Sequence, residues 1–172
     1  MPETNYRNFE LGFGRWVAIA PLLGSLLAVL TEFCHLLAQA QSPPNLENIT
    51  IGPRFSPNSL QVRGSGGGNV PVKDIVGISE TPTGSCTGFA NAKPNHTLVL
   101  TSFFNSLSLQ VESPEDTAIA IKGPGGVWCN DDYQGKNPGV SGQWLAGTYQ
   151  VWVSSYGKNR FPTYILRITE VR

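Results

Sequence analysis

Apolar and polar residues alternate with a period of two along several segments of this 172-residue chain, and this pattern constrains the fold most. Such alternation is typical of strands with one buried and one solvated face, so we expect antiparallel β-sheets. The expected apolar faces consist of Leu98 and Leu100; Leu107, Leu109 and Val111; Ile119 and Ile121; Tyr149, Val151 and Val153; and Tyr164, Leu166 and Ile168.

Turn-forming sequences separate these segments, and they include Ser113-Pro114-Glu115-Asp116, Gly123-Pro124-Gly125-Gly126 and Lys136-Asn137-Pro138-Gly139. The composition, with 19 Gly, 13 Pro and 40% hydrophobic residues, is rich in turns but too apolar for a disordered chain. Strands spaced about ten residues apart with such turns favour a sandwich or barrel. No segment after residue 41 has a clear helical period, and a further short strand is expected at residues 59–63.

The N-terminal forty residues have the features of a secretory leader. Residues 16–30 form an apolar run that is short for a membrane span but suits a signal peptide, and Ala38-Gln39-Ala40 fits a cleavage site. We therefore predict a signal peptide at 1–40, a Pro-rich linker or N-terminal arm at 41–58, and one domain at 59–172. The alternative is an uncleaved N-terminal anchor. After cleavage we expect a secreted or periplasmic protein with no membrane insertion.

Two of the three cysteines lie in the expected mature chain. Cys34 falls in the leader, which leaves Cys86 and Cys129, 43 positions apart. In an oxidising compartment such a pair forms a disulfide, and the alternative is two separate buried thiols. Two cysteines this far apart with a single histidine between them do not make a zinc site.

The charge balance excludes one class of partner. The chain has 12 basic and 12 acidic residues, and loss of the leader removes two arginines and three glutamates, so the mature region stays near neutral. It also has no cluster of Lys and Arg. We therefore expect no binding to nucleic acid, since that requires a basic surface.

The segment from about Ser85 to Glu170 contains a set of spaced motifs: Val127-Trp128-Cys129-Asn130-Asp131-Asp132, Gly135-x-x-Pro138, Trp144, and Gly147-Thr148-Tyr149-x-Val151-x-Val153, with Tyr156 as the aromatic that follows the strand. Through these motifs it resembles the bacterial pre-peptidase C-terminal domain, in a short secreted version common in cyanobacteria. The resemblance implies an all-β fold, an antiparallel jelly-roll-like β-sandwich, and a domain without catalytic activity of its own.

The residues themselves also give little support for catalysis. His96 is the one histidine of the expected mature chain, and no Gly-x-Ser-x-Gly nucleophile turn accompanies it. Asp131 and Asp132 are neighbours in one loop, whereas a glycoside hydrolase needs two carboxylates that face each other across a cleft. We therefore predict no catalytic residues, with an unrecognised hydrolase as the least favoured alternative.

The stretch Asn130-Asp131-Asp132 makes an oxygen-rich loop that could hold calcium, with Asp116 supplied by the preceding turn. Calcium prefers six to eight hard oxygen ligands in a flexible loop. The spacing is not that of an EF-hand, and the alternative is a solvated turn whose side chains cap their own backbone. Calcium is thus a candidate ligand, and no other cofactor is expected.

Four aromatic residues are candidates for ligand binding: Trp128, Trp144, Trp152 and Tyr156. Trp152 alternates with Val151 and Val153, which places it on the outer face of its sheet. The four rings could form a platform for a sugar or a peptide. The alternative is that Trp128 and Trp144 pack in the core over the disulfide while the N-terminal arm covers Trp152.

These observations favour a secreted, non-catalytic binding or accessory module that acts on protein or polysaccharide. The alternative is a structural protein of the cell envelope with no small ligand. Exposure of Trp152 and Tyr156 separates the two, because a binding platform needs exposed rings.

Overall fold

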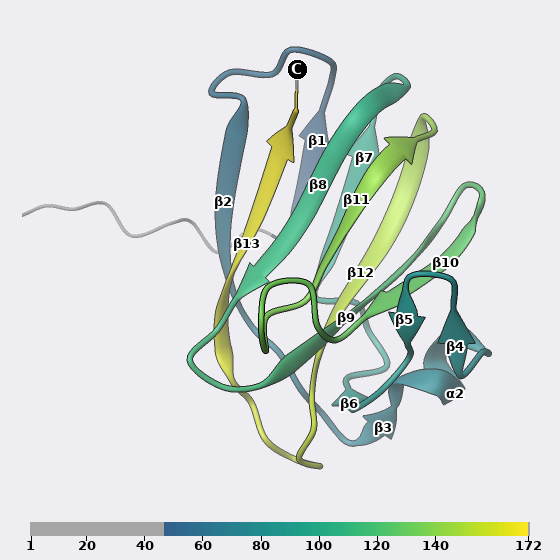
Figure 1. Ribbon diagram of the computed structural model, residues 1–172, viewed down its shortest axis with the longest axis vertical. Helices are drawn as coiled ribbons and strands as arrows, with labels where there is room; N and C mark the ends of the chain where they lie inside the picture. The colour runs from purple at the N-terminus through teal and green to yellow at the C-terminus, as the bar shows by residue number, and fades with distance from the viewer. Residues whose placement is uncertain (1–46, 172) are drawn as a thin grey trace, which may run out of the picture. The chain divides into compact units, whose positions relative to one another are not determined.

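The computed structural model describes residues 47–171, which form an all-β sandwich with one short helix (Figure 1). A seven-stranded sheet faces a four-stranded sheet. The seven-stranded sheet contains β1 (Asn48–Ile51), β3 (Val70–Pro71), β6 (Phe89–Ala90), β7 (His96–Leu100), β9 (Thr117–Gly123), β10 (Gly126–Asn130) and β12 (Gly147–Ser155). The four-stranded sheet has the order β11 (Gly139–Trp144), β8 (Phe104–Glu112), β13 (Thr163–Glu170) and β2 (Ser59–Ser65), all antiparallel.

The sandwich interior is built from the alternating segments that the sequence predicts. Every residue of the five expected apolar faces is buried in one core cluster, from Leu98 in β7 to Ile168 in β13. Burying one such side chain stabilises the fold by about 1.5–3 kcal/mol relative to its exposure. The predicted all-β sandwich and the faces of its central strands are therefore confirmed.

The outer face of the seven-stranded sheet is also covered. A helix, α2 (Val72–Val76), and a hairpin of β4 (Glu80–Thr81) and β5 (Gly84–Ser85) lie against it (Figure 1). The helix buries Val72 and Val76 in a second cluster, and Gly77 ends it with a φ of 83°. At five residues the helix is too short to show a helical period, which explains why the sequence did not indicate it.

The segment 41–58 contains a strand where the sequence analysis expected an irregular arm. Strand β1 pairs in parallel with β7, with Ile49 opposite Leu98 and Ile51 opposite Leu100. Ile49 and Ile51 are buried in the main core. Four residues of alternation among four prolines are too few to recognise from sequence, but two buried isoleucines are enough to hold the strand at the edge.

We call the part of the chain that contains α2, β4 and β5 the covering segment. The predicted disulfide joins Cys86 to Cys129 and so links the covering segment to β10. Thr81 strengthens this junction, because its hydroxyl lies 3.0 Å from the Cys129 amide nitrogen and accepts its hydrogen. The predicted signal peptide at 1–40 lies outside the described residues. Between residues 47 and 171 no helix is long and apolar enough to cross a membrane.

Candidate functional site

The structure separates the four candidate aromatic residues instead of gathering them into one platform. Trp128 and Trp144 point into the sandwich and pack with Tyr149; the ring centroids of Trp144 and Tyr149 are 5.0 Å apart, and those of the two tryptophans 5.8 Å. Trp144 is 4% exposed, and its indole nitrogen donates to the Leu107 carbonyl at 2.9 Å. This group stabilises one end of the core, and Trp144 offers no open ring face to a ligand.

Trp152 lies on the outer face of its sheet, as its position in the strand predicts, but it is only 3% exposed. It sits in the cluster of Val72, Val76 and the two disulfide cysteines. The covering segment that includes α2 therefore buries it, and not the N-terminal arm. The sequence could place the side chain on a face but could not show that a later excursion of the chain would cover that face.

Tyr156 alone among the four is well exposed, at 46%. Its hydroxyl donates to the Asp131 carboxylate at 3.1 Å. Partial burial, and then the negative charge of Asp131, raises the pKa of Tyr156 to about 12, with Asp116 and Asp132 adding smaller effects. The phenol therefore stays protonated at neutral pH and keeps donating to Asp131, and the three carboxylates lie near one exposed ring.

One of the four residues predicted as calcium ligands already uses its side chain in hydrogen bonds within the protein. The Asn130 side chain is used internally: its carbonyl oxygen accepts from the Gly139 amide at 2.9 Å, and its nitrogen donates to the Thr83 carbonyl at 2.9 Å. Asn130 therefore shapes the loop. Within residues 47–171 no three His, Cys, Asp or Glu side chains are grouped so that they could hold a metal ion.

Three loops meet at the end of the sandwich where Tyr156 lies, and we call residues 113–116, 131–138 and 156–162 the loop end. The Ser113 amide donates to the Asn137 side chain at 3.1 Å, and Lys136 donates to the Pro114 carbonyl. Arg160 forms an ion pair of 2.8 Å with Glu115. Since each loop is bonded to another, the loop end is a connected surface and not three independent segments.

The loop end carries three large exposed rings. Tyr133 is 47% exposed, Tyr156 46% and Phe161 57%. Sequence reasoning found Tyr156 but missed Tyr133 and Phe161, since neither lies in a strand pattern. Their positions in loops, next to turn residues, were the only signal available.

His96 lies in the core and not in a cleft. It is 2% exposed, and its Nε2 atom is 2.7 Å from the Tyr164 hydroxyl. Burial raises the pKa of Tyr164, so the phenol remains neutral. This pair is packed between the sheets, where both side chains are buried.

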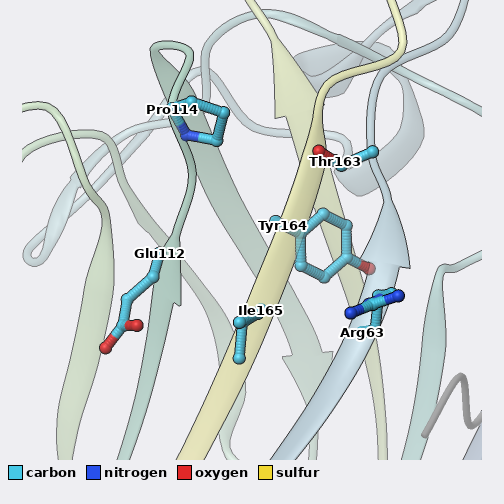
Figure 2. Close-up of a pocket in the computed structure, with 6 residues that line it drawn as sticks. All are labelled: Arg63, Glu112, Pro114, Thr163, Tyr164 and Ile165. Atoms are coloured by element: carbon cyan, nitrogen blue, oxygen red, sulfur yellow. The ribbon is translucent and has the colours of Figure 1, made fainter. Parts of the chain in front are cut away.

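A hollow of about 320 Å³ lies on the four-stranded sheet and was not indicated by the sequence (Figure 2). Its lining comes from three strands and one turn, and consists of Arg63, Glu112, Pro114, Thr163, Tyr164 and Ile165. Strand register brings these residues together from positions as far apart as 63 and 165, so no local motif could have marked them.

Two solved structures similar to this chain are small β-domains. The pre-peptidase C-terminal domain of a collagenase from Bacillus anthracis is 14% identical, matches 74% of this chain and 100% of its own, and gives a TM-score of 0.38. PliG from Aeromonas hydrophila, a periplasmic inhibitor of g-type lysozyme, is 13% identical over 72% of this chain and 96% of its own, also with a TM-score of 0.38. No family model matches the chain, and no curated protein matches it either. The chain is thus similar to the kind of domain that its sequence motifs resemble, while identities and TM-scores this low assign no function to it.

Proposed function

We propose that this chain is a non-catalytic binding module of the extracellular space or periplasm that holds a protein or a polysaccharide by its loop end. The observation that carries the proposal is the set of exposed rings at Tyr133, Tyr156 and Phe161 on loops that are bonded to one another. Tyrosine rings give a large contact area at a small cost in conformational entropy. Loops already fixed before binding lose little further freedom when a ligand arrives.

The chemistry around Tyr156 fits such a role. Its phenol and the carboxylates of Asp131 and Asp132 combine an apolar ring with strong hydrogen-bond acceptors. Sugar hydroxyls and peptide amides both donate to such acceptors, while the ring packs on apolar parts of either ligand. The disulfide supports export, because such bonds persist in oxidising compartments.

The test is retention of the purified, oxidised protein on immobilised cellulose, chitin, peptidoglycan and casein. Tyr156→Ala and Phe161→Ala should weaken retention on whichever probe binds. Phe103→Ala is the matched control, because Phe103 is equally exposed (48%) but lies just before β8, at the opposite end of that strand from residues 113–116 of the loop end. If none of the probes retains the protein, or if the three variants lose retention equally, the loop end is not the binding surface.

One observation favours the structural alternative, in which the domain stabilises an envelope assembly. Trp144 and Trp152, two of the rings that a larger platform would need, are buried. A purely structural sandwich predicts that Tyr156→Ala and Phe161→Ala leave every binding measurement unchanged.

Calcium at the loop end remains a prediction, with Asp116, Asp131 and Asp132 as the side chains that would hold it. Melting in millimolar calcium and in a chelator tests it directly. A melting temperature raised by calcium in the parent chain but not in Asp131→Ala would support the site, and identical melting in both solutions would exclude it.

A further inference from the structure

The outer face of the four-stranded sheet carries a row of side chains set by strand register. Ile165 of β13 pairs with Arg63 of β2 on one side and with Glu112 of β8 on the other. Figure 2 shows these three side chains on three adjacent strands. Their strand neighbours Val62, Val111 and Leu166 are buried in the core, so the row itself faces outward.

A second row lies one step along the strands. Arg167 of β13 pairs with Gln61 of β2 and with Gln110 of β8, and Gln110 in turn pairs with Gly139 of β11. The row thus crosses all four strands, a width of about 14 Å at the usual strand spacing. It consists of planar, hydrogen-bonding side chains and ends at a glycine.

The glycine makes room for an aromatic ring. A Cβ atom at position 139 would lie 3.0 Å from the Cγ and Cδ1 atoms of Tyr133 and 3.2 Å from the Cγ of Gln110. The Tyr133 ring therefore packs against the β11 backbone where the side chain is missing. Since Tyr133 remains half exposed, part of the ring is left open to solvent beside Gln110.

The two rows border two hollows that have one lining residue in common. Glu112 lines the hollow of about 320 Å³ that contains Arg63, and it also lines a smaller one of about 20 Å³ beside Tyr133 and Gln110. The surface therefore offers an aromatic ring at one side, planar polar groups in the middle, and a guanidinium at the other side.

The charges on this face are not balanced. Arg167 donates to one oxygen of Glu112 from both its Nε and its Nη2 atoms, at 3.0 and 2.7 Å, which neutralises that carboxylate. Arg63 is exposed and has no ion-pair partner among residues 47–171. A guanidinium in a hollow with apolar neighbours Ile165 and Pro114 is suited to bind a carboxylate in a two-bond arrangement.

We infer that this face binds an acidic polysaccharide, with a sugar carboxylate at Arg63 and a sugar ring against Tyr133. The inference rests on the proposed binding role and adds to it a ligand class and the neighbouring sheet face, which shares Tyr133 with the loop end. Hydroxyls of the sugars between these two ends would bond to Gln110 and to the free oxygen of Glu112. A polymer with a carboxylate on each unit spans the 14 Å width, whereas a single small anion reaches Arg63 alone.

The experiment measures binding of the purified, oxidised protein to polygalacturonate by calorimetry, with the methyl-esterified polymer as the uncharged control. Polygalacturonate should bind, and esterification should weaken binding strongly. Arg63→Ala should weaken it by about tenfold or more, as expected for loss of a charge-assisted pair. Lys122→Ala, which removes an exposed positive charge from the other sheet, should change it by no more than about twofold. All variants alter exposed side chains, and their melting temperatures should equal that of the parent.

Three outcomes would overturn the inference. The first is no binding of polygalacturonate, and the second is equal loss in Arg63→Ala and Lys122→Ala, which would indicate non-specific attraction. The third is equally tight, Arg63-dependent binding of polyglutamate, which would make the partner an acidic polypeptide. Retention on cellulose, chitin, peptidoglycan or casein that depends on Tyr156 and Phe161 would still support the proposed function in each case, so the two failures are distinguishable.

Discussion

Removing the disulfide is the perturbation whose effect can be worked out most directly. Cys86 and Cys129 are separated by 43 positions, so the bond closes a long loop that runs from β6 to β10. In the chain-entropy description, closing a loop of this length lowers the entropy of the unfolded chain by about 13 cal/mol/K. This corresponds to about 4 kcal/mol of stability at room temperature.

The variant Cys86→Ala with Cys129→Ala removes the bond without leaving a free thiol. Both side chains are buried, and alanine keeps their Cβ atoms in the second cluster, so the change in packing is small. Urea unfolding followed by tryptophan fluorescence gives the free energy of unfolding. With a slope of about 2 kcal/mol/M, the midpoint should fall by about 2 M.

The parent protein treated with a reductant is the control, and it should unfold at the same urea concentration as the double variant. A fall in the midpoint of less than about 0.5 M, with an unchanged slope, would mean a loss below about 1 kcal/mol. That result would refute the view that the cross-link limits the freedom of the unfolded chain.

Three further predictions concern single side chains. Trp152→Ala should lower the free energy of unfolding by about 3–5 kcal/mol in the same urea assay, because it empties a space beneath α2. Tyr156 should form tyrosinate near pH 12, and Asp131→Asn should lower that pKa without restoring 10, since burial is the larger cause. Because the folded pKa is above the unfolded one, the corresponding stability is complete below about pH 10 and is lost as the pH rises to about 12, which pH-dependent unfolding can follow. Gly67→Ala should destabilise the fold by more than about 1 kcal/mol, since its backbone has a φ of 79° and a Cβ would lie 1.8 Å from the Arg160 carbonyl oxygen; an unchanged melting temperature would contradict this.

The sequence predicted the core residues best in strands that have one buried face and one solvent-exposed face. The strands at residues 107–111 and 164–168 have this pattern, and their apolar residues all lie in the core. It was least informative where both faces of a strand are covered. In β9 the outward residue Ala120 is buried as well, because it packs in the second cluster with Val72 and Val76 of α2, and the segment containing α2 has no recognisable period.

The candidate site could be predicted only in part, for a related reason. Tyr156 follows directly from the end of a recognisable strand, and the adjacent carboxylate of Asp131 belongs to a visible loop motif. The juxtaposition of Arg63, Ile165 and Glu112 depends on the register of three strands. Register is a property of the pairing between strands and not of any one strand. The pattern within each strand therefore did not predict which residues would become neighbours across the sheet.

Because Trp128 and Cys129 are adjacent in β10, formation of the Cys86–Cys129 disulfide depends on the register in which β10 pairs. Neighbouring residues of a strand point to opposite faces, so Trp128 enters the sandwich while Cys129 faces the covering segment. In the native register, Ala120 of β9 lies between Cys129 and Trp152. A slip of β10 by one residue would turn the sulfur inward, out of reach of Cys86, and the indole outward. Formation of the disulfide therefore reports on correct strand alignment. Oxidation can join Cys86 to Cys129 only in molecules in which β10 is already paired with β9 in the native register.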